Sequence, residues 1–155
     1  MGEPKLVAEL VPSSTWGWNL RSVLTEKGWG VVRQKVYEKA GSLCQICGGK
    51  GSKHPVECHE RWVYDDRKHV QKLVGLEALC PSCHEVRHIG RAFQVGRGPK
   101  AMRHMMKVNS WTLEQVEAHI EEAMKIWKGR SSFVWKLDLT WLGGVPTEFL
   151  KASKG

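Results

Sequence analysis

The chain is 155 residues long, a length typical of one domain with a modest hydrophobic core. Its 24 lysines and arginines outnumber its 16 acidic residues, and the formal net charge of +8 favours an anionic partner, nucleic acid first. The N-terminus lacks an apolar signal core and no apolar stretch is long enough to cross a membrane, so we expect a cytoplasmic protein that does not bind membranes.

The first forty residues predict one strand and one helix. Residues 5–12 alternate loosely between apolar and polar side chains and end at a proline, which favours a short strand. Apolar side chains recur at helical spacing from Glu26 to Ala40, and Gly41 can end that helix. The helix would then lead the chain into the central segment, where all five cysteines lie.

The central segment predicts two strands followed by a helix. Strand signals over residues 55–64 and 74–79 flank a polar turn. Pro81 suits the first position of a helix that continues through His88 toward Ala92. The predicted order is therefore strand, strand, helix.

A loop, a basic segment and a longer helix are expected next. The glycines of residues 93–99 predict a flexible loop, and a short basic segment follows at residues 100–107. Thr112 and Gln115 have the spacing of a capping box. The apolar stripe behind them predicts a helix that ends near Gly129.

The C-terminal part predicts one strand and a tail. A half-buried strand that could pair with the N-terminal strand is predicted here, because apolar residues alternate with Lys136, Asp138 and Thr140; the apolar residues are Phe133, Trp135, Leu137, Leu139 and Trp141. Residues 143–155 favour a frayed tail. Trp127, Trp135 and Trp141 fall on apolar faces and are expected in the core.

Four cysteines form two C-x-x-C pairs, Cys44 with Cys47 and Cys80 with Cys83. The two-residue spacer lets both sulfurs of a tight turn face one ion, so this spacing predicts a zinc site. Four thiolates fill a tetrahedral shell and leave no open position. We therefore expect a structural rather than a catalytic zinc ion.

Three histidines stand near these cysteines in the sequence. His84 and His88 are four residues apart on the predicted helix, so both side chains project from one face and can share a second ion. His59 lies on the opposing predicted strand, and the neighbouring Cys58 could be a further ligand. A histidine beside a metal-bound phosphodiester suits hydrolysis, because neutral imidazole can take a proton from the attacking water.

The order of these motifs resembles the HNH endonuclease family, which carries a ββα-metal core, also called the His-Me finger. The resemblance covers about residues 40–92, and the Trp-rich N-terminal flank is similar to small stand-alone HNH proteins of bacteria and phages. The residues that carry it are Cys44-x-x-Cys47, Val56-Glu-Cys58-His59 and Gly75-Leu-Glu-Ala-Leu-Cys80-x-x-Cys83-His84.

The resemblance implies an α+β fold, with a zinc-stabilised ββα-metal core, flanking helices and a short pair of N- and C-terminal strands. We expect a single domain over residues 1–155, with the core module at about 40–92. A strand and helix in residues 1–40 would precede the core. A helix and strand in residues 110–142 and a tail over 143–155 would follow it.

The resemblance also implies roles for the site residues. His59 falls on the general base of the family, and Cys58 and His84 fall on ligands of the catalytic ion. Colicin-type members add a ligand one helical turn later, which matches His88. The expected cofactors are the structural Zn²⁺ and a second divalent ion, Mg²⁺, Mn²⁺, Ni²⁺, Co²⁺ or Zn²⁺.

The chain departs from the family pattern in two places. The asparagine that names the motif is missing, since Asn19 and Asn109 both lie outside the core. In the family this asparagine steadies the loop that carries the general base, so Gln71 or His69 would have to do so here. Cys58 is a soft thiolate where magnesium enzymes offer a carboxylate, which favours softer ions. Alternatively, Cys58 is a packed apolar residue and the site is impaired.

Basic residues surround the predicted site. None of them forms a code for reading bases, so we expect contacts with DNA phosphates, strong salt dependence and little intrinsic sequence preference. The residues are Arg87, Arg91, Arg97, Lys100 and Arg103 after the second cysteine pair, with Lys50 and Lys53 on the other side.

The sequence thus predicts a metal-dependent DNA endonuclease that hydrolyses phosphodiester bonds, by nicking or double-strand cleavage, in a bacterial or phage-infected cell. The alternative is a zinc-bound DNA-binding or adaptor module with a degenerate nuclease site, which the missing asparagine and Cys58 favour.

Overall fold

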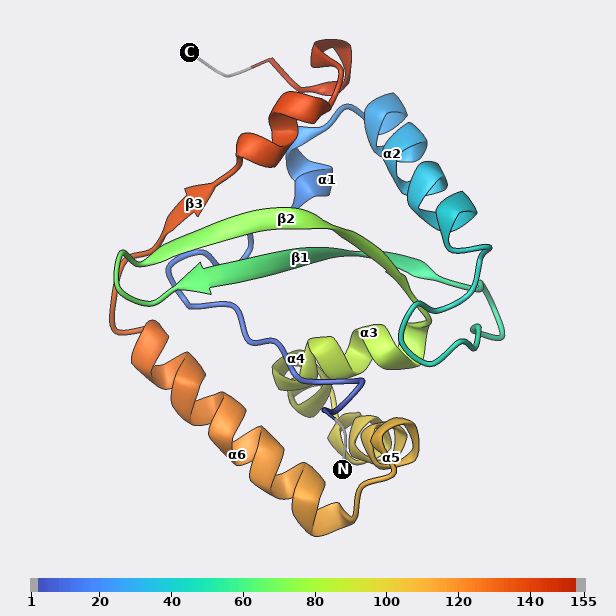
Figure 1. Cartoon of the computed structure of the whole chain (residues 1–155), viewed down its shortest axis with the longest axis vertical. Coiled ribbons are helices and arrows are strands. Elements are labelled where there is room, and N and C mark those ends of the chain that lie inside the picture. Colours follow the sequence, from blue (N-terminus) through green and yellow to red (C-terminus); the bar gives the residue numbers. More distant parts are fainter. Residues whose placement is uncertain (1–2, 153–155) are drawn as a thin grey trace.

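The computed structural model describes residues 3–152, which form an α+β fold around a three-stranded sheet. Strand β1 (Glu57–Asp65) pairs antiparallel with β2 (Val70–Leu79), and the short β3 (Lys136–Asp138) joins β2 in parallel. One side of the β1–β2 hairpin carries helices α1 (Leu20–Val23) and α2 (Glu26–Lys39) (Figure 1). The other side carries α3 (Pro81–Arg87), α4 (Ile89–Gln94), α5 (Gly98–Asn109) and α6 (Leu113–Arg130). Within the described range, no helix is long and apolar enough to cross a membrane.

The N-terminal segment contains no strand, so the strand expected over residues 5–12 is wrong. Residues of helices α3 and α5 accept hydrogen bonds from the N–H groups that a strand would donate to a neighbouring strand. The N–H groups of Lys5 and Leu6 both donate to Asn109 Oδ1, at 3.0 and 2.9 Å. The N–H of Glu9 donates to the carbonyl of Arg87 at 3.0 Å. The segment is therefore fixed to α5 and α3 rather than to the sheet.

The helix expected over residues 26–40 is confirmed as α2, which Thr25 caps by accepting from the N–H of Gly28. The hairpin and α3 follow in the predicted order of two strands and a helix. Strand β2 begins at Val70, four residues earlier than predicted, because Gln71 and Leu73 alternate as buried residues on one face.

The helix expected to run toward Ala92 is broken into two. Helix α3 ends at Arg87, because the backbone angles of the next residue, His88 (φ −104°, ψ 48°), are not helical, and α4 starts at Ile89. Cys80 caps α3, since its sulfur accepts from the N–H of Cys83. The break matters because it falls on a predicted site residue.

The expected loop and basic segment over residues 93–107 are largely helical, with a short connection between α4 and α5. A side chain at Gly98 would collide with the ring of Phe93, so this glycine allows tight packing instead of flexibility. Ala101 and Met105 are buried on the inner face of α5. The capping box of Thr112 and Gln115 at the start of α6 is confirmed.

The C-terminal residues pack on α1 and α2 instead of fraying. Two 3₁₀ turns, Thr140–Gly144 and Thr147–Phe149, replace most of the expected strand and tail. Val145 is buried, and Leu150 forms an isolated antiparallel bridge with Leu24. The expected pairing of terminal strands is wrong, because β3 pairs with β2. Of the expected tail, residues 153–155 lie outside the described part of the chain.

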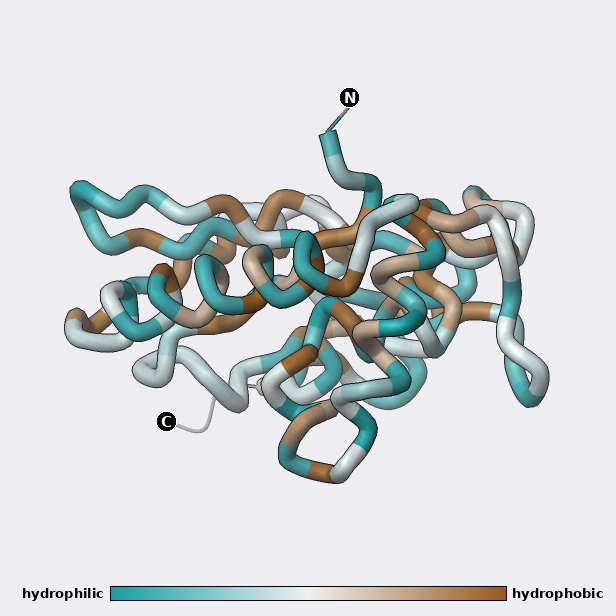
Figure 2. The backbone as a smooth tube through the Cα atoms, turned by 90° about the horizontal axis from the view of Figure 1, so that it is seen from below, coloured by the Kyte–Doolittle hydropathy of each residue, from teal (hydrophilic) through white to brown (hydrophobic). Residues whose placement is uncertain are grey.

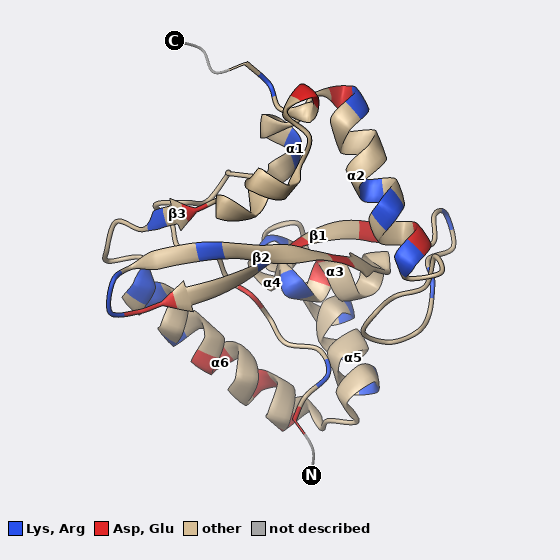
Figure 3. Cartoon of the chain, turned by 45° about the horizontal axis from the view of Figure 1, so that its top comes forward, with Lys and Arg blue, Asp and Glu red and all other residues tan. Residues whose placement is uncertain are grey.

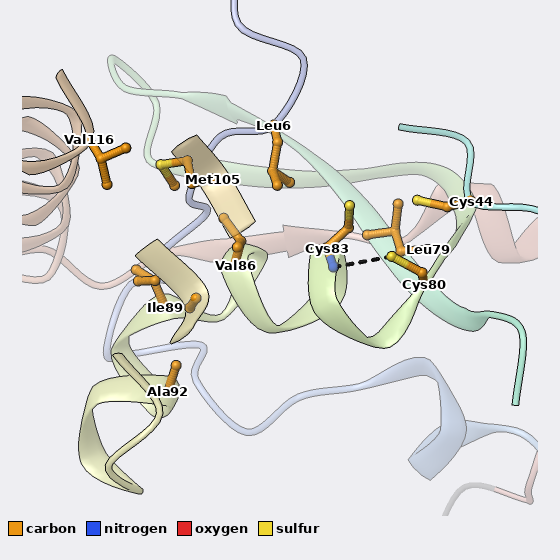
Figure 4. Packing of buried hydrophobic residues seen from close by; sticks show 11 residues of the cluster. Leu6, Cys44, Leu79, Cys80, Cys83, Val86, Ile89, Ala92, Met105 and Val116 are labelled. Carbon is orange, nitrogen blue, oxygen red and sulfur yellow. Dashed lines mark hydrogen bonds between the residues drawn. The ribbon is translucent and has the colours of Figure 1, made fainter. Parts of the chain in front are cut away.

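Two hydrophobic clusters lie on opposite sides of the hairpin. Hydrophobic and hydrophilic residues are interspersed along the coiled segments of the backbone (Figure 2). The smaller cluster centres on Leu20, Leu24 and Val145. Trp135 is buried as expected, whereas Trp127 and Trp141 are only partly buried. The larger cluster joins the N-terminal segment to α3, α4, α5 and α6 (Figure 4), through Leu6, Leu79, Val86, Ile89, Ala92, Met105 and Val116.

Candidate metal centres and basic groove

The four cysteines of the two C-x-x-C pairs come together at one end of the hairpin. One sulfur from each lies within 4.8 Å of all the others, so the group could hold a structural metal such as zinc. The Sγ atoms of Cys47 and Cys80 are 3.7 Å apart. Zn–S bonds of about 2.3 Å in a tetrahedron would place two sulfurs about 3.8 Å apart. The donor set and its spacing therefore fit a zinc ion.

Backbone N–H groups point at three of these sulfurs. The N–H of Cys47 lies 3.5 Å from Cys44 Sγ, that of Gly49 lies 3.4 Å from Cys47 Sγ, and that of Cys83 lies 3.4 Å from Cys80 Sγ (Figure 4 shows the last contact). Such contacts favour thiolates over thiols, since a thiolate is the stronger acceptor. The sequence pattern folds locally into turns that prepare the sulfurs for a cation.

The four sulfurs lie close enough for each to affect the protonation of the others. The hydrogen bond from Cys83 lowers the pKa of Cys44 to about 4, against the opposing effect of burial. Burial raises the pKa of Cys80 to about 11, and the bond to Cys44 raises the pKa of Cys83 well above its usual range. A divalent ion would neutralise the negative charge of the four thiolates, and its binding would release the protons of the thiols.

A second group of possible ligands consists of His59 on β1, His84 in α3 and His88 at its end. One ring nitrogen of each lies within 4.8 Å of the others. The ring centroids are 5.1 Å apart for His59 and His84, 5.1 Å for His59 and His88, and 4.9 Å for His84 and His88. The structure thus brings together three of the four residues predicted for the catalytic centre.

Two carboxylates lie at hydrogen-bond distance from ring nitrogens of this histidine cluster. Glu57 Oε1 lies 2.9 Å from His84 Nδ1, and Glu9 Oε2 lies 2.9 Å from His59 Nε2. The second oxygen of Glu57 bonds to His54 Nε2 at 2.8 Å. Burial lowers the pKa of His88 to about 4, and the charges of His84 and His59 act in the same direction. Neutral imidazoles backed by carboxylates can bind an ion or accept a proton.

The structure does not bring Cys58 into this cluster. Neighbouring residues of a strand point to opposite faces, so Cys58 and His59 diverge. Tyr37 and Arg33 of α2 lie within electrostatic range of Cys58, on the side away from α3. Burial raises the pKa of Cys58 to about 12, so its thiol stays protonated. The packed-residue alternative for Cys58 describes this environment.

Neither residue expected to replace the missing asparagine contacts His59. The side chain of Gln71 is fully buried and accepts from Thr15 Oγ1 at 2.6 Å. The ring of His69 stacks on Phe133 with centroids 4.0 Å apart. Both residues hold the far end of the sheet against other segments.

A groove of about 660 Å³ opens beside His84 and His88. Basic residues occur along α4 and α5 and in the loop before β1 (Figure 3). Four of them line this groove, Lys53, Arg91, Arg97 and Lys100. Arg97 also forms an ion pair with Glu85. The groove therefore combines positive charge with two of the three clustered histidines, His84 and His88.

The other basic residues predicted for DNA contact lie elsewhere. Arg87 is largely buried, because its guanidinium donates to the carbonyl of Val7 at 3.2 Å and to Glu77 at 3.3 Å. Arg103 lines a smaller hollow of about 320 Å³, which shares Ser82, Glu85 and Lys100 with the groove. Lys50 is absent from the residues that line the groove. Arg87 thus fixes the N-terminal segment instead of facing the groove.

Sequence patterns gave no sign of Glu9 or Glu57 as partners of the histidines. Glu57 stands two residues before His59, on the same face of β1, so strand periodicity could have found it. Glu9 is separated from His59 by 50 residues on a segment without regular structure, and no local pattern could have found it.

Comparison of the chain with protein-family models, with curated proteins and with solved structures finds no match in any of the three.

Proposed function

We propose that this protein is a metal-dependent endonuclease of the HNH type, which hydrolyses phosphodiester bonds of DNA. The observation that carries the proposal is the histidine cluster of His59, His84 and His88, which borders a basic groove and lies close in sequence to the four-cysteine cluster. The four cysteines would hold a structural zinc ion and thereby fix the start of α3.

His84 and His88 would hold the second ion through neutral ring nitrogens. The fit rests on their mutual spacing and on Glu57, which engages His84 Nδ1 and leaves Nε2 as the free nitrogen of that ring. A divalent ion at this position supplies positive charge for the phosphate oxygens as the phosphodiester bond breaks.

His59 would act as the general base. Its side chain is 3% exposed, and its ring centroid lies 5.1 Å from those of His84 and His88, which line the groove. Its Nδ1 is buried and has no hydrogen-bond partner among residues 3–152, whereas Nε2 faces Glu9. An imidazole nitrogen with a free lone pair can take the proton of the attacking water.

The groove suits the backbone of DNA. Arg91 and Lys100 are exposed and form no ion pair with the described acidic residues, so both are free to contact phosphates. Phosphate contacts position a nucleic acid without reading its sequence. We therefore propose DNA as the substrate because of the positive charge of the groove, and we expect the protein to have little intrinsic sequence preference.

The test is cleavage of supercoiled plasmid by the zinc-loaded protein, with Mg²⁺, Mn²⁺, Ni²⁺, Co²⁺ and Zn²⁺ in parallel. Wild type should cut with at least one ion, and His59→Ala should cut roughly 10²–10⁴-fold more slowly. A matched control is His69→Ala, which removes a histidine outside the cluster. Equal rates for wild type and His59→Ala would refute the assigned role.

The position of Cys58 favours a second candidate, a zinc-bound DNA-binding module without catalysis. If His59 serves as the base and Cys58 lies outside the cluster, two side chains, His84 and His88, remain to bind the second ion. Metal titration separates the candidates. An endonuclease centre binds a second ion whose affinity falls on His84→Ala, whereas a binding module stops at the ion of the cysteines.

A further inference from the structure

Glu9 reaches the histidine cluster from outside the hairpin and α3. Its Oε2 lies 2.9 Å from Nε2 of His59, and the two residues are 50 positions apart in the sequence. The side chain of His59 is 3% exposed and that of Glu9 is 27% exposed. The contact is therefore largely shielded from water, where a charged acceptor interacts strongly with an N–H donor.

Glu9 meets the imidazole of His59 with one carboxyl oxygen, at hydrogen-bond distance from Nε2. A glutamate carboxyl group is ordinarily ionised near neutral pH. An ionised carboxylate can only accept hydrogen bonds. The proton of the neutral imidazole of His59 must therefore sit on Nε2, which leaves the lone pair on Nδ1.

The segment that carries Glu9 is fixed at Glu9 itself and at the two residues before it. Its own N–H donates to the carbonyl of Arg87 at 3.0 Å, and Arg87 in turn donates to the carbonyl of Val7 at 3.2 Å. The N–H of Ala8 donates to His119 Nε2 at 3.1 Å. A carboxylate on such a segment is held in position before any ligand arrives.

We propose that Glu9 is the positioning residue of His59, which holds its ring orientation and keeps the lone pair on Nδ1. This inference rests on the proposed function, in which His59 is the base. Glu9 thereby does, from the N-terminal segment, what Gln71 and His69 do not do from the hairpin. When Nδ1 accepts a proton, the negative charge of Glu9 also stabilises the imidazolium that forms.

The two substitutions that separate these effects are Glu9→Ala and Glu9→Gln. Glu9→Ala removes the acceptor, so the imidazole can exchange its proton between the two nitrogens. Glu9→Gln keeps an oxygen that accepts from Nε2 but removes the charge. Glu117→Gln is the matched control, because Glu117 is an exposed carboxylate on α6 that forms no hydrogen bond with the histidine cluster.

The first readout does not depend on catalysis. Nitrogen chemical shifts of the His59 ring, measured by NMR on the zinc-loaded full chain, report which nitrogen carries the proton. Wild type, Glu117→Gln and Glu9→Gln should show the proton on Nε2, and Glu9→Ala should show a mixture. A proton on Nδ1 in the wild type, or no change in Glu9→Ala, would overturn the proposal.

The second readout is cleavage kinetics on a short DNA duplex. Glu9→Ala should lower kcat roughly 10–100-fold, the usual effect of losing a residue that orients a histidine, and leave KM nearly unchanged. The kcat of Glu9→Gln should fall between those of Glu9→Ala and wild type.

If wild type does not cleave at all while the NMR result holds, the proposed function fails and the positioning of His59 by Glu9 stands. If cleavage holds and Glu9→Ala keeps the wild-type kcat, the positioning role fails alone.

Discussion

His104 of α5 lies 3.1 Å from the sulfur of Cys83 through its Nε2 atom. The contact joins α5 to the four-cysteine cluster across 21 residues of sequence. A hydrogen bond from an imidazole N–H to a zinc-bound thiolate disperses negative charge and fixes the orientation of the ligand. His104 therefore belongs to the surroundings of the four-cysteine cluster, although it supplies none of the four sulfurs.

His104→Ala should weaken zinc binding roughly 10–100-fold, because outer partners of metal ligands have effects of this size. Competition with a chromophoric chelator measures the affinity. His69→Ala is a suitable control, since His69 stacks on Phe133. Equal zinc affinity in all three proteins would show that the contact does not act on the ion.

Removal of one sulfur should unfold the centre of the protein. Cys83→Ala leaves three ligands at a site whose zinc contributes on the order of 10 kcal/mol to folding. We expect loss of bound zinc and of the cooperative thermal transition, measured by metal analysis and circular dichroism.

Cys58→Ala is the matched control for that loss. Cys58 lies outside the four-cysteine cluster and is a half-buried thiol beside α2. The variant should keep one zinc per chain and its thermal transition, with a loss of stability of about 1 kcal/mol from packing. Loss of zinc in Cys58→Ala, or its retention in Cys83→Ala, would contradict the assigned ligand set.

Local patterns carried the predictions that succeeded. The C-x-x-C spacing, the capping box of Thr112 and the helical stripe of α2 each depend on residues close in sequence, and each is present in the structure. Patterns of this kind fix short elements because the interactions that form them are local.

Tertiary packing decided the elements that sequence patterns missed. The alternation of residues 5–12 describes an extended segment, but its N–H groups find Asn109, Arg87 and His119 instead of a strand. Gly98 resembles a loop residue and is in fact the contact point for the ring of Phe93. Glu9 enters the candidate site only through this packing, so nothing near His59 in the sequence could reveal it.

Phosphate contacts in the groove should make DNA binding depend on salt, and Arg91 should contribute to that dependence. Arg91→Ala should weaken binding and reduce the slope of log affinity against log salt by about one. Arg21→Ala on α1 removes the same charge on the other side of the hairpin and is the control. Fluorescence anisotropy at several salt concentrations measures both. Equal slopes for wild type and Arg91→Ala would remove this arginine from the DNA-binding surface.

Acid should loosen the segment that carries Glu9, through His119. Burial lowers the pKa of His119 below its ordinary value of 6.5, and its Nε2 must stay unprotonated to accept from the N–H of Ala8. A histidine with a lowered pKa in the folded state contributes stability above pH 6.5 and loses it as the pH falls below that value. His119→Gln retains an acceptor oxygen that does not titrate. Urea unfolding at pH 7.5 and 5.5 should therefore show a larger loss of stability for wild type than for His119→Gln.

His119→Ala should lose about 1 kcal/mol of unfolding free energy already at pH 7.5, the size of one hydrogen bond. The same loss between the two pH values in wild type and His119→Gln would assign the acid sensitivity to other groups, because the remaining histidines are identical in both proteins.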